Sequence, residues 1–264
     1  MNELLPVISW YHTHKRTIVW RNEHTTAWGV LVSEVMSQQT QVSRVEPLWE
    51  AWMRRWPTPA DVASAPTSEV IRAWANLGYP RRALRLQEAA RIVAEEGMPT
   101  TVEGLLKLPG VGDYTARAVA AFAYGQRVGV VDTNVRRVVS RAFGIKPTIE
   151  AVENLLPLTD APTASVALME LGALVCTKNP QCGACPLSGR CQWDGTVEVT
   201  RKQGRFAGSH RQVRGKILAL LREKGPVPSV DVAWPDPSMR QVALDSLIAD
   251  GLVVHHEGHY DLPA

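Results

Sequence analysis

The sequence LPGVGD at residues 108–113 decides the fold, because it joins two helical patterns through a very short turn. Leucines recur in the segment before it, and residues 113–124 are rich in alanine, which favours helix. Pro109 ends the first helix, since the residue before a proline avoids the helical conformation. Gly110 and Gly112 permit a tight turn and a close approach to the backbone. The unpaired N–H groups that open the second helix can then bind a phosphate, although an ordinary helix–turn–helix connection is the alternative interpretation.

The remainder of the chain up to residue 200 is also predicted to be helical. Apolar residues recur with helical spacing, and Pro57 and Pro59 end one of the helices. Asp132 stands where a helix N-cap is expected. No segment before residue 200 has the pattern of a strand. We therefore expect a mainly α body, with helices in 1–20 and over 28–42, 45–56, 67–76, 80–96, 101–107, 113–124, 133–143, 150–156 and 163–175.

The character of the sequence changes near residue 200. Residues 201–205 form a polar, basic linker, and helical patterns follow over 211–223 and 237–250. Residues 252–255 and 259–262 then flank a Glu257-Gly258 turn, as the strands of a β-hairpin do. This order predicts a small winged-helix-like module over 201–264.

Composition excludes some classes of protein and leaves others open. The chain has 264 residues, of which 45% are hydrophobic and 21% charged, as in globular proteins. No apolar run approaches the ~20 residues that a membrane span needs, and the N-terminus does not resemble a secretion signal. The net charge of +3 permits nucleic-acid binding without requiring it. Two groups of arginines suit DNA contacts, namely Arg81, Arg82 and Arg85, and Arg136 and Arg137, but such clusters are also common on solvated faces.

Four cysteines fall within sixteen residues, with the spacing C-x5-C-x2-C-x5-C. Four thiolates this close together can hold one tetrahedral zinc ion or one iron–sulfur cube. Two disulfides, or free thiols, are the alternative, and the absence of a secretion signal weighs against it. The spacing predicts a metal centre at Cys176, Cys182, Cys185 and Cys191.

Two carboxylates are candidates for acid–base chemistry. Glu34 lies in an apolar and amide-rich helical pattern, with Gln38 and Gln41 expected on its face. A carboxyl in a partly apolar environment has a raised pKa and can donate a proton near neutrality. Asp132 could stabilise a sugar cation, since cleavage of a glycosidic bond uses two carboxylates. A solvated helix glutamate and a simple helix cap are the alternatives.

Together these segments resemble the helix-hairpin-helix (HhH-GPD, endonuclease III-like) DNA glycosylases, and within them the adenine DNA glycosylase (MutY) branch. The similarity covers residues 10–195. It is carried by the following motifs, in this order: Trp20-Arg21, SEVM at 33–36, QQTQV at 38–42, Leu77-Gly78-Tyr79, LPGVG at 108–112, Tyr114-Thr115-Ala116, Val131-Asp132, Asn134-Val135 and ELGA at 170–173 running into the cysteines.

The resemblance implies a fold, a cofactor and a location. It implies a two-lobed fold, with a six-helix lobe over 24–127, a cluster lobe formed by 1–23 plus 128–200, and the active site between them. It also implies a 4Fe–4S cluster on the four cysteines. The chain would be a short form, because residues 201–264 are too few for the Nudix-like domain of full-length members. We expect a monomeric, cytoplasmic and nucleoid-associated bacterial protein with no membrane partner.

The resemblance further implies that double-stranded DNA with a mismatched adenine is the substrate, and that the adenine is flipped out of the duplex. Glu34 would protonate adenine N7, Asp132 would stabilise the sugar cation, and Tyr114 and Asn134 would support them. The substrate-binding residues would be Trp20, Arg21 and Glu170 around the adenine, and Gln39, Thr40 and Tyr79 in the space left in the duplex. The hairpin residues Gly110, Val111 and Gly112 would bind a DNA phosphate.

Position 114 discriminates among relatives. Bifunctional members carry a lysine there, and only an amine can form a Schiff base. Tyr114 therefore predicts base removal without efficient strand cleavage. A thymine or uracil mismatch glycosylase is one alternative, and a non-catalytic DNA-binding protein is another. Several positions depart from the family pattern, namely Val19, Pro80, Thr133 and the first cysteine gap, which is one residue short.

Overall fold

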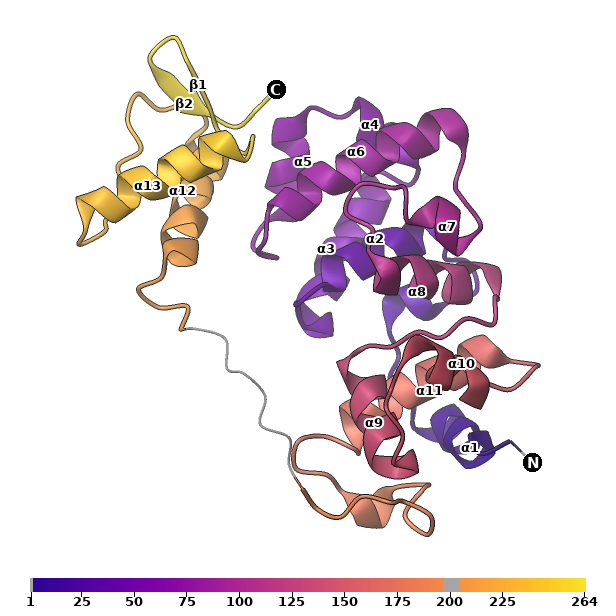
Figure 1. Ribbon diagram of the computed structural model, residues 1–264. Coiled ribbons are helices and arrows are strands. Elements are labelled where there is room, and N and C mark those ends of the chain that lie inside the picture. Colours follow the sequence, from indigo (N-terminus) through magenta and orange to yellow (C-terminus); the bar gives the residue numbers. More distant parts are fainter. Residues whose placement is uncertain (1, 197–204) are drawn as a thin grey trace. The chain divides into compact units, whose positions relative to one another are not determined.

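The computed structural model describes residues 2–196 and 205–264 and is mainly helical, as predicted (Figure 1). Contacts divide the chain into two units, Met1–Glu34 with Met98–Thr200, and Val35–Gly97 with Arg201–Ala264. The lobe boundaries expected from the sequence remain a prediction. The first unit contains α1 (Leu5–His14), η1 (Val19–Arg21), most of α2 (Ala27–Ser37), α7 (Val102–Leu105), α8 (Asp113–Tyr124), α9 (Thr133–Phe143), α10 (Ile149–Leu155), α11 (Ala161–Leu174) and η2 (Cys182–Ala184). The second contains α3 (Val42–Arg55), α4 (Pro59–Ser64), α5 (Thr67–Trp74), α6 (Arg81–Glu96), α12 (His210–Lys224), α13 (Pro237–Ala249), β1 (Val254–His256) and β2 (His259–Asp261).

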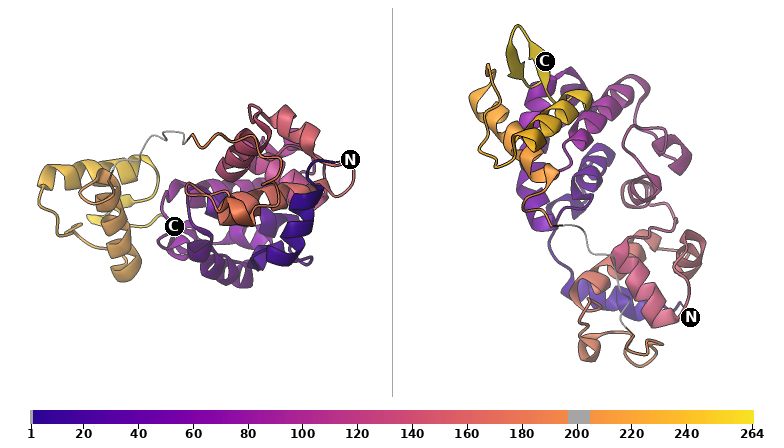
Figure 2. Two further views of the ribbon diagram at one scale, coloured as in Figure 1. Left: turned by 90° about the horizontal axis from the view of Figure 1, so that it is seen from below. Right: turned by 60° about the vertical axis from the view of Figure 1, so that its left-hand side comes forward.

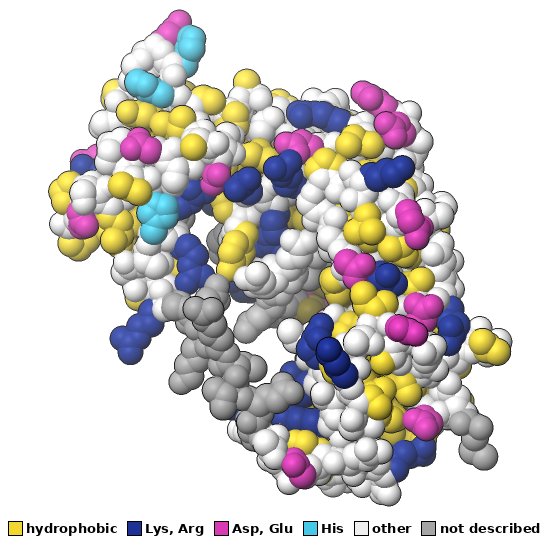
Figure 3. Space-filling view, viewed as in Figure 1, with side chains coloured by type: hydrophobic (Ala, Val, Ile, Leu, Met, Phe, Trp, Pro, Cys, Tyr) yellow, Lys and Arg dark blue, Asp and Glu magenta, His cyan; other side chains and the backbone are white. Residues whose placement is uncertain are grey.

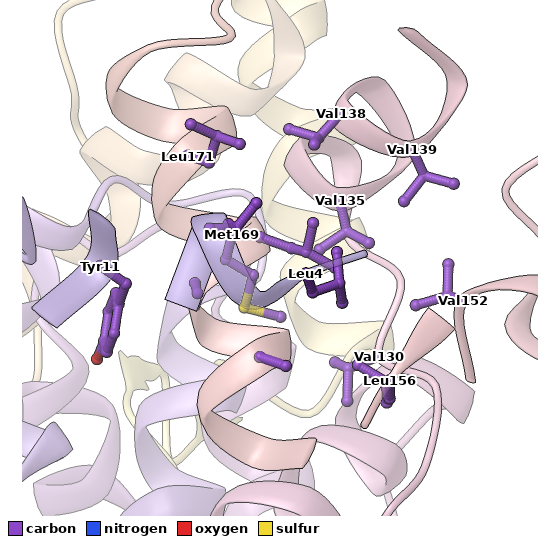
Figure 4. Packing of buried hydrophobic residues seen from close by; sticks show 14 of the residues in the cluster. Leu4, Tyr11, Val130, Val135, Val138, Val139, Val152, Leu156, Met169 and Leu171 are labelled. Atoms are coloured by element: carbon purple, nitrogen blue, oxygen red, sulfur yellow. The ribbon is translucent and has the colours of Figure 1, made fainter. Parts of the chain in front are cut away.

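The core of the first unit forms where α1 and α9 pack against α11. Val135, Val138 and Val139 repeat with helical spacing, so they share the buried face of α9. Figure 4 shows Val138 beside Leu171 of α11 and Val135 beside Leu4. The helices approach closely at Gly172, where an added Cβ would lie 2.6 Å from Cβ of Asn134. This packing fixes the N-terminus of α9, which carries Asp132 and Asn134.

The predicted hairpin is formed by α7 and α8. Thr101 caps α7, accepting a hydrogen bond of 3.1 Å from the N–H of Gly104. Leu108 is buried, and Gly110 has a φ of 79°, which a non-glycine residue rarely adopts. Helix α8 begins at Gly112 without a side-chain cap. The turn therefore has the backbone that the LPGVGD sequence predicts.

The second unit contains a helical layer and a C-terminal module. Helix α6 packs against α4 and α5. In the module, α12 packs against α13, with Ile217 and Leu247 in one buried cluster (Figures 1 and 2). Strands β1 and β2 pair antiparallel, with His255 opposite Tyr260. Two helices followed by a hairpin is the order predicted for residues 201–264, of which 201–204 lie outside the described residues.

Two helix predictions need correction. Helix α2 ends at Ser37 rather than at residue 42, because Gln39 adopts a left-handed conformation and Gln41 precedes α3 in extended conformation. Gln38 and Gln41 therefore do not continue the helical face of Glu34. Helix α4 was missed because Pro59 was interpreted as a helix stop. Proline fits the first turn of a helix, and Thr58 forms a capping box there with Asp61.

Within the described residues, no helix has both the length and the apolar character needed to cross a bilayer. Figure 3 shows Lys and Arg side chains interspersed with Asp and Glu on the face in view. Binding of DNA must therefore depend on particular basic residues more than on the modest net charge of +3.

Candidate active site

Asp132 is fixed at the N-terminus of α9. Its Oδ1 accepts a hydrogen bond of 2.6 Å from the N–H of Val135, and its Oδ2 accepts one of 2.9 Å from Nδ2 of Asn134. Burial raises the pKa of Asp132 above its ordinary value, while these hydrogen bonds and the charge of Arg137 favour the ionised form. Asp132 is therefore both the helix cap and a carboxylate with a defined orientation.

Glu34, on α2, has the electrostatic environment of a proton donor. Burial raises its pKa from 4.5 to about 7, and the negative charge of Asp132 acts in the same direction. A hydrogen bond with Tyr114 and the positive charge of Arg21 partly oppose this rise. Each of these groups is therefore close enough to Glu34 to change its proton affinity. The sequence alone could not bring Glu34 and Asp132 together, and the structure does so within one unit.

Tyr114, in the first turn of α8, connects the two carboxyls. Burial raises the pKa of its hydroxyl well above 10, and the charges of Glu34 and Asp132 add to this effect. The phenol therefore stays protonated and donates its hydrogen bond to Glu34. Because Tyr114 is the second residue of α8, two positions after Gly112, the hairpin that was expected to bind phosphate also positions this hydroxyl.

Glu170 supports Arg21. Its side chain is fully buried on α11, and both of its oxygens accept hydrogen bonds from guanidinium groups. Oε1 lies 2.9 Å from Nη1 of Arg21 and 2.5 Å from Nη2 of Arg16. Burial raises the pKa of Glu170, but the two arginines outweigh it and hold the pKa below its ordinary value. The sequence analysis did not name Arg16 as a site residue. Arg16 follows α1 in the sequence, and no local pattern indicates that it pairs with the buried Glu170 on α11.

Trp20 lies directly before Arg21 in the sequence, in the short helix η1, and is buried.

The hairpin residues divide between the interior and the surface. Val111 is buried, whereas Gly110 and Gly112 are exposed. An added Cβ at Gly112 would meet no atom within 4 Å, so the space over this part of the turn is open.

Arg137 connects Asn134 to the cysteine loop. Its Nη2 donates to Oδ1 of Asn134 at 2.8 Å and to the carbonyl of Gly172 at 2.6 Å. Its Nε donates to the carbonyl of Cys176 at 2.5 Å. One turn further along α9, Arg141 donates to the carbonyl of Thr177 at 2.7 Å. Arg137 was considered from the sequence only as a DNA contact or a solvated charge, because its burial follows from tertiary packing.

The four cysteines are free of disulfides. Burial raises the pKa of Cys185, and the charges of Cys176, Cys191 and Cys182 raise it further, so all four thiols are within electrostatic reach of one another. Across residues 2–196 and 205–264, no three His, Cys, Asp or Glu side chains are arranged as a metal-binding group. The chemistry of the donor set, four thiols in a short loop, nevertheless fits an iron–sulfur cluster, since a cationic centre relieves the repulsion among thiolates.

The remaining candidates belong to the second unit. Gln39 and Tyr79 are exposed and lie in two turns, one before α3 and one before α6. The Thr40 hydroxyl lies 3.2 Å from the carbonyl oxygen of Leu77, to which it donates, so the two turns are joined. Gln39, Thr40 and Tyr79 are expected to fill the space left in the duplex and are called the wedge residues below. They are neighbours in space, although about forty positions separate Tyr79 from the other two in the sequence.

The comparisons with known proteins identify the family of the chain. The family model for the HhH-GPD superfamily base excision DNA repair proteins matches residues 32–158. The chain is 52% identical over 267 residues to the adenine DNA glycosylase of Mycolicibacterium smegmatis, covering 94% of this chain and 91% of that one. It is 47% identical over 284 residues to the adenine DNA glycosylase of Mycobacterium tuberculosis, covering 97% and 92%. The structure of a thermostable thymine-DNA glycosylase matches with a TM-score of 0.68 and 27% identity, covering 72% of this chain and 94% of that one.

A helical fold built around this hairpin, with a carboxyl of raised pKa near a second carboxylate, and the match to the family model define a DNA N-glycosylase of the helix-hairpin-helix class. The resemblance seen in the sequence is thereby confirmed. The chain belongs to the adenine DNA glycosylase (MutY) branch of the HhH-GPD superfamily.

Proposed function

We propose that this protein hydrolyses the N-glycosidic bond of adenine mispaired with 8-oxoguanine or guanine in double-stranded DNA. The observation that carries the proposal is the state of Glu34, whose pKa of about 7 lets it hold a proton and release it at neutral pH. The 52% identity to an adenine DNA glycosylase over nearly the whole chain supports adenine as the base.

In the proposed reaction, Glu34 transfers its proton to N7 of the flipped adenine, and the bond between the base and the sugar C1′ then breaks with its electrons leaving on adenine. Asp132 stabilises the positive charge that develops on the sugar. Water adds to C1′ and loses a proton, which completes the hydrolysis. Tyr114 orients the Glu34 carboxyl through its hydrogen bond, and Asn134 orients Asp132 through its amide.

Arg21 and Glu170 act as a pair in this proposal. Glu170 holds the guanidinium of Arg21, and the charge of Arg21 limits the rise in the pKa of Glu34. Without that charge the pKa of Glu34 would rise further, which would make it a weaker acid toward adenine. Trp20 would line the adenine site with them.

For the DNA, we propose that Gly110, Val111 and Gly112 bind a backbone phosphate at the start of α8. Gln39, Thr40 and Tyr79 would fill the space that the flipped adenine leaves.

Tyr114 has no amine, so the enzyme would release the base without efficient strand cleavage. The protein would act as a monomer on the bacterial nucleoid.

We further propose that Cys176, Cys182, Cys185 and Cys191 hold a 4Fe–4S cluster. When bound, such a cluster supplies a structural cross-link within the loop, and no reaction step depends on it. Iron and sulfide analysis of the purified protein should give four of each per chain, as the formula of the cluster requires. Zinc in place of iron would contradict this assignment. Cys182→Ser should lose visible absorbance and thermal stability.

The test of the function is base release from three matched duplexes, containing A:8-oxoguanine, A:G or T:G, analysed with and without alkali. We expect release of adenine from the first two, with strand breaks appearing only after alkali. Release of thymine alone would favour a thymine mismatch glycosylase, which the thermostable structural relative makes the relevant competitor. Binding of the duplexes without release of any base would indicate a non-catalytic DNA-binding protein.

A further inference from the structure

Two exposed residues of the second unit have an unusual backbone conformation. Gln39 has a φ of 55° and Tyr79 a φ of 47°, so both are non-glycine residues in the left-handed region. Residues other than glycine adopt this region rarely, and they stay there only where the surrounding structure enforces it. Gln39 follows the end of α2, and Tyr79 precedes α6. Something must therefore hold both turns in place.

The side chain of Arg82, in the first turn of α6, makes the contacts that do this. Its Nη1 lies within 2.7–3.1 Å of three carbonyl oxygens at the C-terminal end of α2, those of Val35, Met36 and Gln38. Its Nη2 donates to the carbonyls of Leu77 and Gly78 at 3.3 and 3.0 Å. The acceptors lie within the four residues before Gln39 and the two residues before Tyr79.

The guanidinium of Arg82 also contacts one hydroxyl and two aromatic rings. Nη2 of Arg82 also lies 3.2 Å from the Thr40 hydroxyl, on the other side of Gln39. The carbon of the guanidinium lies 5.2 Å from the centre of the Trp74 ring and 5.6 Å from that of Tyr79, within the range of cation–π contacts. The indole of Trp74 in turn donates to the carbonyl of Gly78 at 3.0 Å. The wedge turns are thus fixed from both sides by one cation.

We propose that Arg82 is a positioning residue, which holds Gln39 and Tyr79 together in the conformation that enters the DNA duplex. The inference rests on the proposed function, in which these two side chains replace the flipped adenine. A planar guanidinium is needed because its fork serves acceptors from two turns at once, whereas an ammonium group is a single point charge. Both terminal nitrogens of Arg82 contact oxygens of the protein and its Nε is buried, so it acts through the two wedge residues and not as a phosphate contact.

The test compares Arg82→Lys with Arg91→Lys, a matched change at an exposed position further along α6. Both variants keep the net charge. We expect Arg82→Lys to slow single-turnover release of adenine by roughly 10- to 100-fold, since several part-buried hydrogen bonds to a charged group are lost. Arg91→Lys should stay within about twofold of the wild type. Equal rates for Arg82→Lys and the wild type would overturn the proposal.

A double-mutant cycle separates positioning from a general effect on folding. In a protein already carrying Gln39→Ala and Tyr79→Ala, Arg82→Lys should slow release by no more than about threefold, because the side chains it positions are gone. The same 10- to 100-fold loss in both backgrounds would overturn the proposal. Thr40→Val removes the contacts of the Thr40 hydroxyl with Arg82, Gln38 and Leu77 but leaves the carbonyl contacts of Arg82, so it should cause a smaller loss that also disappears in the truncated background.

A spectroscopic measurement reports on the wedge directly. The fluorescence of 2-aminopurine beside the target adenine rises when the base step is unstacked, and Glu34→Gln prevents turnover during the measurement. Within the Glu34→Gln protein, adding Arg82→Lys should reduce this rise at saturating protein concentration, whereas adding Arg91→Lys should not. An unchanged rise with Arg82→Lys would contradict the proposal. Failure of the proposed function would look different, because the wild type would then release no adenine from any duplex.

Discussion

The pH dependence of adenine release follows from the environment of Glu34. The acid must be protonated to act, and its pKa is about 7. The protonated fraction therefore falls from about 90% at pH 6 to about 10% at pH 8, so the single-turnover rate should drop roughly tenfold over this interval. An ordinary glutamate with a pKa near 4.5 would already be ionised at pH 6. The profile thus distinguishes a desolvated acid from a freely solvated one.

The structure also predicts how the profile moves when a neighbour is changed. The hydrogen bond from Tyr114 lowers the pKa of Glu34, since it stabilises the carboxylate. Tyr114→Phe removes this bond and should shift the midpoint of the falling limb to higher pH, whatever happens to the maximal rate. Arg21→Met should shift it in the same direction, because the positive charge of Arg21 also favours the carboxylate.

The assay is single-turnover release from an A:8-oxoguanine duplex between pH 5 and 9, with protein in excess and at constant ionic strength. Glu34→Gln provides the control, since any residual release should show no break near pH 7. Two results would refute the assignment of Glu34 as the acid. One is a wild-type rate that falls with a midpoint below pH 5, and the other is a midpoint that moves to lower pH in Tyr114→Phe.

Three further predictions concern stability and chemistry. First, the raised pKa means that folded Glu34 binds more protons than unfolded Glu34 between about pH 4.5 and 7, so the wild type loses stability as pH rises through this window. Glu34→Gln does not titrate, and its Tm advantage should grow between pH 5 and pH 8; a constant difference would contradict this. Second, Gly172→Ala should lower the free energy of unfolding by about 1–3 kcal/mol, because the new Cβ would lie within 3 Å of Asn134 backbone atoms. Gly215→Ala, whose Cβ meets nothing within 4 Å inside α12, should be neutral or stabilising in the same thermal melts. Third, Tyr114→Lys introduces the missing amine, and borohydride should trap it on DNA; no covalent complex would mean that position 114 is out of reach of the sugar.

Much of the fold was predictable because local signals agreed with the tertiary structure. Helices over 113–124 and 133–143 were predicted with the bounds observed, since glycine, aspartate and alanine mark them clearly. The errors arose where local signals conflict. The amide-rich segment after Ser37 looks helical, but the contacts of Arg82 with the carbonyls at the end of α2 favour a turn there. Proline at 59 starts a helix instead of ending one, because Thr58 caps it.

The site was less predictable, because its contacts join distant parts of the chain. Glu34 and Asp132 were proposed as a pair only through the family resemblance, and their mutual electrostatic effect emerges from the packing of α2, α8 and α9. Arg82 and Arg137 were grouped with their charged neighbours as surface residues. No periodicity distinguishes them from Arg81 or Arg136, since burial of an arginine depends on carbonyl groups brought near it by other helices.

The most direct test of the account is the single-turnover release of adenine by Glu34→Gln from the A:8-oxoguanine duplex at pH 7, measured together with the Kd for the same duplex. Loss of a general acid costs roughly 10²- to 10⁴-fold in rate. We predict a loss of at least about 100-fold in release with a Kd within a few-fold of the wild type. Release within about tenfold of the wild type, at unchanged affinity, would contradict the central claim that Glu34 protonates the departing base.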